Sequence, residues 1–186
     1  MTSNQGHSGS CACCGDLMRG MYDRRRFLQA AAGAGAALAL APGFALAAKG
    51  HYEAMVLACI DPRFQEPVRN YMVRRKLTGK YSQFVFAGAA IGVVAPAFKE
   101  WHKTFWDNLG ASIELHNIKR VIVLDHRDCG AAKIAYGDEK VATRDAETDT
   151  HRQALVEFRK QCNERHAKLA VETGLMSLDG KIQTFS

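Results

Sequence analysis

Hydrophobic residues follow two different spacings after about residue 50. Short apolar runs such as "MVLAC" and "VIVL" are typical of strands buried on both faces of a parallel sheet. Between them, apolar positions three or four residues apart predict amphipathic helices. The expected strands are residues 52–59, 81–88 and 120–125, the expected helices are residues 64–77, 96–109 and 148–173, and residues 174–185 are expected to form a turn and a short strand. This alternation predicts an α/β fold with a largely parallel central sheet flanked by helices.

The beginning of the chain has the pattern of an export leader. The segment "DRRRFLQ" (residues 23–29) is followed by a weakly apolar run rich in Ala and Gly, and "ALA" (residues 45–47) is a small-x-small cleavage site. This order resembles a twin-arginine signal. The alternative is an amphipathic or membrane-anchoring helix, for which the run is short and rich in glycine.

Two parts of the chain are therefore expected: a twin-arginine signal peptide over residues 1–47 and one folded domain over residues 48–186. The first implies the Tat translocase as a partner during export, and a periplasmic or secreted mature protein. No run after Ala47 is apolar for long enough to span a bilayer, so no stable membrane insertion is expected after cleavage.

The charge of the chain does not indicate a nucleic-acid partner. The formal net charge is +6, but the basic residues are scattered. Their one cluster, Arg74 to Lys76, falls on an expected helix, where a solvated face is the simpler interpretation than a binding patch.

The cysteines of the expected domain do not form a disulfide framework. Three of the six lie in "CACC" (residues 11–14), and Cys59, Cys129 and Cys162 remain, an odd number. Free thiols are a liability in an oxidising compartment, and metal ligation would protect two of them. Cys162 has no partner at ligand spacing and is interpreted as a packed or free thiol.

Candidate ligands stand where the buried strands end. Cys59 ends the first expected strand, and His126 and Cys129 directly follow the third. Because the carboxyl ends of parallel strands meet at one edge of the sheet, neighbouring strands would bring these side chains together. Two thiolates and an imidazole suit zinc, and three protein ligands leave the fourth position open, as in catalytic sites. Each residue alone would be an ordinary buried thiol or histidine, so the assignment depends on the combination.

The order Cys-x-Asp-x-Arg, then sixty-odd residues, then His-x-x-Cys-Gly resembles the β-carbonic anhydrase family. "LACIDPRF" and "LDHRDCGAAK" are similar to its two metal motifs, and the resemblance covers most of residues 48–186. It implies one Zn²⁺ per chain, held by Cys59, His126 and Cys129. It also implies a zinc-dependent lyase, a carbonate dehydratase, which interconverts carbon dioxide and bicarbonate through a zinc-bound hydroxide.

Asp61 and Arg63 are the candidate catalytic pair. Arg63 can bind Asp61 with two hydrogen bonds and keep it ionised. Considered without their neighbours, the two would be an ordinary surface ion pair. The family resemblance implies that the pair orients the metal-bound hydroxide, and that in some relatives the aspartate binds zinc and closes the site.

One turn departs from the family pattern and leaves alternatives open. Where the family has Arg-Asn-Ala-Gly, this chain has Val85-Phe86-Ala87-Gly88, a more apolar turn. Phe86, Gly88 and Gly130 are expected to line the substrate pocket. An apolar pocket would suit a sister enzyme that hydrolyses carbonyl sulfide or carbon disulfide. A further alternative is an exported zinc-binding protein without turnover.

The resemblance also implies a homodimer or a dimer of dimers, with the site near the subunit boundary. The aromatic residues around Trp101 are candidates for that interface. Histidines on the expected helices, His151 among them, are interpreted as solvated positions, with a proton shuttle as the alternative. Asp128, inside the second motif, is expected to face solvent or cap the following helix.

Overall fold

The computed structural model describes residues 51–185, so the expected leader lies outside the described residues. Within this range one sheet has the strand order β2-β1-β3-β4-β5. Its strands are β1 (Ala54–Ala58), β2 (Tyr81–Val85), β3 (Arg120–His126), β4 (Ala170–Met176) and β5 (Ile182–Thr184). The first four pair in parallel and β5 pairs antiparallel with β4. The predicted α/β fold with a largely parallel sheet is confirmed.

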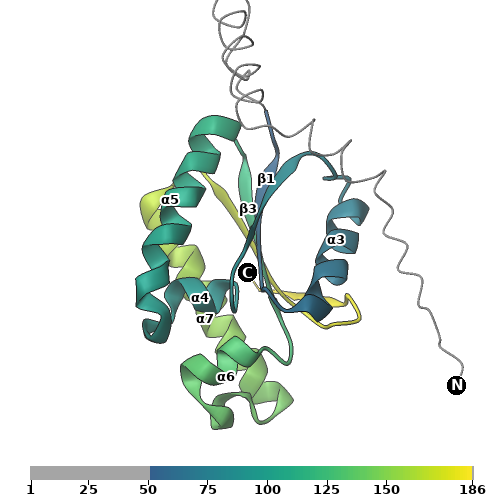
Figure 1. The fold of residues 1–186 in the computed structure, drawn as a ribbon, viewed down its shortest axis with the longest axis vertical. Helices are drawn as coiled ribbons and strands as arrows, with labels where there is room; N and C mark the ends of the chain where they lie inside the picture. Colours follow the sequence, from purple (N-terminus) through teal and green to yellow (C-terminus); the bar gives the residue numbers. More distant parts are fainter. Residues whose placement is uncertain (1–50, 186) are drawn as a thin grey trace, which may run out of the picture. The chain divides into compact units, whose positions relative to one another are not determined.

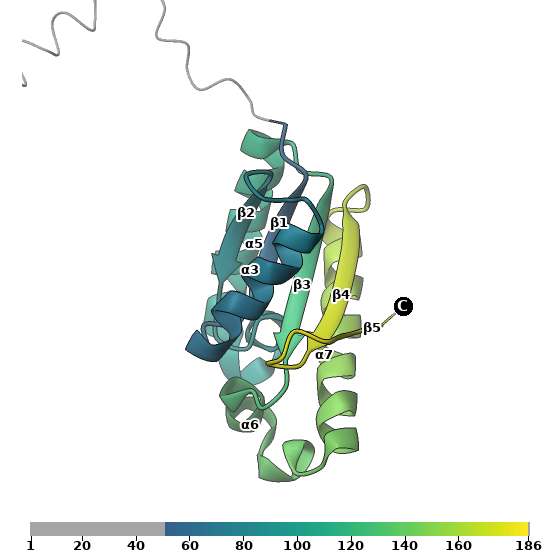
Figure 2. The ribbon, with the colours of Figure 1, turned by 90° about the vertical axis from the view of Figure 1, so that its right-hand side faces the viewer.

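Helices cover both faces of this sheet. Figures 1 and 2 show α3 on one face and α5 and α7 on the other, with α6 beyond the end of the strands. The helices are α3 (Gln65–Arg74), α4 (Ala90–Val94), α5 (Lys99–His116), α6 (Gly130–Tyr136) and α7 (Arg144–Arg165), with short 3-10 turns η1 (Pro62–Phe64), η2 (Pro96–Phe98) and η3 (Asp138–Val141). Between residues 51 and 185, no helix combines the length and apolarity needed to cross a membrane.

The central strands are apolar on both sides because each side meets a helix. In β1, Val56 packs in the cluster that contains Phe64 and Met72, on the α3 side. The alternate residue Leu57 packs in the second cluster with Phe105 and Phe158, on the α5 and α7 side. This period of two explains why the sequence shows unbroken apolar runs here rather than an alternation of apolar and polar residues.

The expected helix over residues 148–173 is wrong at its carboxyl end. Helix α7 ends at Arg165, and β4 begins at Ala170 and pairs with β3. No Gly or Pro interrupts this stretch, so the apolar spacing gives no stop signal. The β-branched Val171 and Thr173 were the available strand signal, and pairing with a buried neighbour decides the conformation.

An ion-pair network joins α3 to the outer part of the sheet and gives a pH-dependent contribution to stability. Glu172 accepts hydrogen bonds from Arg75 (2.6 Å) and Arg120 (3.0 Å). Partial burial opposes ionisation of Glu172, but the two guanidinium groups outweigh it and lower the pKa of this carboxyl below its usual 4.5.

Because the folded state holds the pKa of Glu172 down, its stabilising effect is present above pH 4.5 and is lost as the pH falls below that value. We expect Glu172→Gln to lower the free energy of unfolding at pH 7 and to flatten its decline below pH 4.5. Urea unfolding at a series of pH values measures this. Glu164→Gln, at an exposed position of α7, is the control. If the free energy of unfolding changed with pH in the same way for the parent and for Glu172→Gln, the expectation would be contradicted.

Candidate metal centre

The two sequence motifs meet because their strands are neighbours. Strands β1 and β3 pair in parallel, with Ala58 opposite Leu124, so both end at the same edge of the sheet. Cys59 directly follows β1, His126 is the last residue of β3, and Cys129 precedes the first turn of α6. One ligand atom from each of these three residues lies within 4.8 Å of the other two, and all three residues are buried. The structure thus brings together the three predicted ligands.

The tautomer and burial of the His126 ring suit metal binding. Its Nδ1 donates to the carbonyl oxygen of Arg127 (2.8 Å), since a carbonyl can only accept. That bond fixes the tautomer and leaves the Nε2 lone pair free in the neutral ring. Nε2 is buried and has no hydrogen-bond partner among the described residues. A buried, unpartnered imidazole nitrogen beside two sulfurs is the donor set that zinc prefers, so the residues fit this ion.

Ionisation of one sulfur of the site opposes ionisation of the other. A hydrogen bond from Cys129 stabilises the Cys59 thiolate against the effect of burial, and contacts with His126 and with the backbone of Asp61 and Gly88 add to it. Together they lower the pKa of Cys59 well below its usual range. The charge on Cys59 and burial raise the pKa of Cys129. A cation between the sulfurs would remove this competition and allow both to ionise.

Asp61 lies at the edge of the ligand group and is held by Arg63. The guanidinium donates through Nε to Oδ1 (3.0 Å) and through its second terminal nitrogen to Oδ2 (2.7 Å). These bonds lower the pKa of Asp61 to about 2, so the carboxylate is ionised at neutral pH. Its Oδ2 lies 4.0 Å from Nε2 of His126. The carboxylate therefore faces the space in front of the three ligand atoms.

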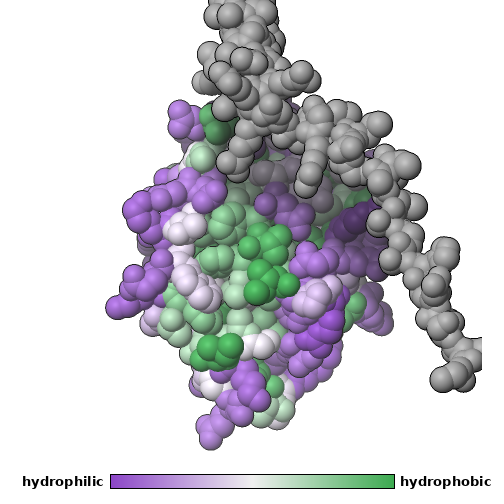
Figure 3. Space-filling model, in the orientation of Figure 1, coloured by the Kyte–Doolittle hydropathy of each residue, from purple (hydrophilic) through white to green (hydrophobic). Residues whose placement is uncertain are grey.

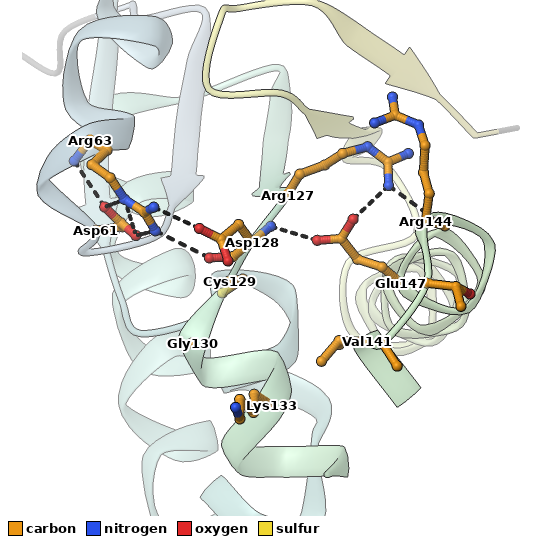
Figure 4. A pocket seen from close by; sticks show the side chains of 12 residues that line it. Asp61, Arg63, Arg127, Asp128, Cys129, Gly130, Lys133, Val141, Arg144 and Glu147 are labelled. Carbon is orange, nitrogen blue, oxygen red and sulfur yellow. Dashed lines mark hydrogen bonds and ion pairs between the residues drawn. The ribbon is translucent and has the colours of Figure 1, made fainter. Parts of the chain in front are cut away.

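Arg63 also ties the first motif to the second. Its remaining terminal nitrogen donates to Oδ2 of Asp128 (2.7 Å). Asp128 has φ +59°, an uncommon value for a residue other than glycine, so external contacts must hold it. On the other side, Glu147 accepts from the Asp128 N–H (2.5 Å) and from Arg127 (2.7 Å). The segment before Cys129 is thus held from both flanks, as Figure 4 shows.

A cavity of about 570 Å³ opens beside these residues. Charged side chains dominate its lining, with Asp61 and Arg63 on one wall and Arg127 and Glu147 on the other (Figure 4). The remaining lining residues are Asp128, Cys129, Gly130, Lys133, Val141, Ala142, Thr143 and Arg144. The cavity leads to one of the ligands, Cys129, and to the candidate catalytic pair.

The three expected pocket residues lie in different places. Gly130 lines this cavity. Phe86 is not among the described residues that line it, and packs against Phe84 and Trp101 instead. Gly88 lies behind the ligands, where its N–H donates to the sulfur of Cys59 (3.3 Å). The more apolar turn therefore does not make this cavity apolar.

Gly88 occupies a position that only glycine fits without strain. Its φ is +78°, and a Cβ atom there would lie 2.9 Å from Cβ of Ala131. We expect Gly88→Ala to lower the free energy of unfolding by at least about 1–2 kcal/mol, the cost of a left-handed L-residue, and to weaken metal binding by displacing the N–H from Cys59. Gly110→Ala is the matched control, because nothing lies within 4 Å of its Cβ position in α5. There we expect stabilisation of up to about 1 kcal/mol. Urea unfolding that gave equal stability for both variants would contradict this.

Sequence reasoning missed three residues that support the site. Glu147 fell in an apparently polar connector, and its spacing from Asp128 gives no signal. His151, expected at a solvated position, is fully buried and bonded to Asp125 (2.8 Å). The third residue is Asp125. Its place at the end of the buried run "VIVLD" was the available signal for the pair, because a buried carboxylate requires a hydrogen-bond partner.

Comparisons with known proteins identify the family and the fold of this chain. Residues 49–159 match the family model described as "Putative carbonic anhydrase". An uncharacterized protein of Rickettsia bellii is 34% identical over 129 residues, which cover 69% of this chain and 79% of that protein. The β-carbonic anhydrase CafA of Aspergillus fumigatus has a TM-score of 0.52 at 15% identity, with 88% of each chain covered. The β-carbonic anhydrase CcaA has a TM-score of 0.53 at 12% identity, covering 92% of this chain and 94% of that one. The chain therefore belongs to the carbonic anhydrase family that this model describes, and it has the fold of the β-class.

Proposed function

We propose that this protein is an enzyme that interconverts carbon dioxide and bicarbonate, with one Zn²⁺ held by Cys59, His126 and Cys129. One observation carries the proposal: these three donors converge beside an ionised carboxylate. That carboxylate, Asp61, lies 4.0 Å from Nε2 of His126 and lines the cavity. Membership of the family supports it. Asp61 and Cys129 both line the cavity, so the proposed metal site adjoins it.

Zinc held there would supply the Lewis acidity that makes water a nucleophile near neutral pH. Asp61, ionised and beside the ligand atoms, would serve as a hydrogen-bond acceptor that orients a water molecule at the site. Arg63 keeps Asp61 ionised and fixes its two oxygens, so the acceptor needs no rearrangement during the reaction. The lining has four cationic and three anionic side chains, a slight positive excess that favours an anionic product.

The lining of the cavity bears on the alternative substrates. Carbonyl sulfide or carbon disulfide would be favoured by an apolar pocket, but the cavity carries charges on both walls and Phe86 packs elsewhere. A zinc-binding protein without turnover would not need an ionised carboxylate in front of the ligands. Carbon dioxide and bicarbonate are therefore the substrates we favour.

Stopped-flow hydration of carbon dioxide by the purified chain tests the proposal, with the zinc content determined on the same sample. We expect fast hydration and about one zinc per chain. Bound zinc without hydration at any pH from about 6 to 9 would overturn the proposed activity and leave the metal site standing. Absence of zinc after incubation with the ion would overturn the metal site itself.

We further propose that the protein is a homodimer or a dimer of dimers. Strand β2 is at the edge of the sheet, and Val85 and Trp101 near it are 39% and 40% exposed. Figure 3 shows hydrophobic side chains gathered in the middle of the face seen in Figure 1, between α5 and α3. Such a patch on an edge strand is a common site of association.

Light scattering coupled to size-exclusion chromatography tests the oligomer. We expect the parent to elute as a dimer or a larger even assembly and Trp101→Glu to shift it toward the monomer, because a charge would be buried in the interface. Leu115→Glu, 58% exposed near the end of α5, is the control for a surface charge. A monomeric parent would contradict the proposal.

We also propose export through the twin-arginine pathway, with cleavage after Ala47. The support is the sequence alone, namely the paired arginines, the weakly apolar run and the cleavage site. Replacement of Arg24 and Arg25 by Lys is expected to retain the chain in the cytoplasm, as judged by cell fractionation. Amino-terminal sequencing of the exported protein would identify the cleavage site.

A further inference from the structure

A fully buried carboxylate and imidazole lie directly behind the candidate metal centre and take no part in the proposed reaction. The Asp125 Oδ2 and His151 Nδ1 atoms are 2.8 Å apart, and both side chains are inaccessible to solvent. Asp125 is the residue before His126 on β3, so the two side chains point to opposite faces of the sheet. Burial of such a pair is costly unless its groups are hydrogen-bonded, which raises the question of what the pair holds.

The second oxygen of Asp125 answers this. Oδ1 accepts the N–H of Ala90 (2.9 Å), the first residue of α4. The residue before α4, Ala89, provides no side-chain cap, so a carboxylate from β3 replaces the usual local cap. His151, on α7, holds that carboxylate from the other side. Three segments distant in the sequence are thus joined at one point.

The turn held by this contact is strained and also touches the metal centre. Gly88 and Ala89 have φ of +78° and +46°. Ala89 combines this φ with a ψ of −111°, a conformation that residues other than glycine rarely adopt. The turn needs an external restraint, because nothing in its own sequence favours this conformation except Gly88. Its conformation aims the Gly88 N–H at the sulfur of Cys59 (3.3 Å). An N–H donated to a thiolate withdraws charge from it and orients it toward the metal.

We propose that the Asp125–His151 pair is a positioning element of the metal centre: it fixes the turn before α4, so that the Gly88 N–H is directed at Cys59. The pair acts through the turn and touches neither metal nor substrate. This inference rests on the proposed zinc site. Arg63 and Glu147 hold the loop before Cys129. The Asp125–His151 pair would add a second, buried series of hydrogen bonds that links α7 to Cys59.

Three variants of the full chain test this. His151→Leu removes the donor to Asp125, and His151→Asn keeps an amide donor near the Nδ1 position. The control is Thr150→Val, a neighbouring buried residue of α7 whose hydroxyl donates to the carbonyl of Lys140 (2.8 Å), away from the turn. Unfolding free energies are measured for all three, so that loss of stability is separated from loss of positioning.

Three readouts apply: hydrogen exchange of the Gly88 and Ala90 amides in metal-free protein, the zinc dissociation constant by chelator competition, and the thiolate-to-cobalt absorption band after cobalt substitution. For His151→Leu we expect faster exchange at both amides, a shifted band and a zinc dissociation constant raised by about 10–100-fold, the usual effect of losing an outer-shell partner. His151→Asn should restore most of the affinity, and Thr150→Val should match the parent.

Equal amide exchange and zinc affinity in His151→Leu and Thr150→Val would overturn the inference. If His151→Leu does not fold, the isosteric Asp125→Asn replaces it. Its weaker, neutral acceptor should speed exchange at Ala90 and Gly88 and reduce zinc affinity, and parent-like values would overturn the inference equally. A parent that binds no zinc would refute the proposed function instead, while amide exchange would still test whether the pair holds the turn.

Discussion

Asp61→Asn is expected to slow carbon dioxide hydration by about 10²–10⁴-fold, the range of positioned acid–base groups, with one zinc per chain retained. The amide keeps the size of the carboxylate and one oxygen for Arg63, but it removes the negative acceptor that faces the ligand atoms. None of the three ligands is altered. Stopped-flow hydration and zinc content on one sample measure both consequences.

Another Asp–Arg pair, exposed on the surface of α7, provides the control for Asp61→Asn. Asp149 accepts from Arg152 at 2.6 Å on α7 and does not line the cavity. Asp149→Asn also removes a negative charge and weakens a hydrogen bond from an arginine, and we expect it to hydrate carbon dioxide at the rate of the parent. Hydration by Asp61→Asn at the rate of Asp149→Asn would show that the carboxylate has no part in the reaction.

Loss of one sulfur should have the largest effect on metal content. We expect Cys59→Ala to raise the zinc dissociation constant well beyond the 10–100-fold typical of outer-shell changes, and hydration to be lost with the metal. Cys162→Ala is the matched control, because Cys162 is equally buried but packs in the core beside Phe158. Metal analysis after dialysis against a weak chelator distinguishes the two variants. A Cys59→Ala protein that retains one zinc per chain would refute the ligand set.

Local pattern was enough to predict the ligand group. Cys59 and His126 each end an apolar run, and parallel strands present their carboxyl ends at one edge. The spacing of Asp61 and Arg63 within one short turn also predicted their contact, because residues two apart at a strand end can reach each other. These inferences needed only the neighbourhood of each residue and the assumption that β1 and β3 are adjacent.

What the sequence could not show depends on contacts between distant segments. The roles of Glu147 and His151 arise only when α7 packs on the sheet beside β3, and neither residue has a distinctive neighbour in the chain. The amino-terminal part of β4 was assigned to a helix because its conformation depends on pairing with β3. Phe86 was placed in the pocket because it stands in the turn where the family has Arg-Asn-Ala-Gly, although its ring packs against Trp101 instead.

The adjacency of β1 and β3 also determines when the ion can be acquired during folding. Cys59 and His126 are neighbours in space, but β2 and α5 separate them along the chain. Pairing of parallel strands across such a separation is a slow, late event. The proposed zinc site is complete only after β1 and β3 have paired, so zinc would bind to the folded protein rather than to the unfolded chain. Bound zinc would then stabilise the native state by mass action, by about 2.7 kcal/mol when free zinc is 100 times the dissociation constant.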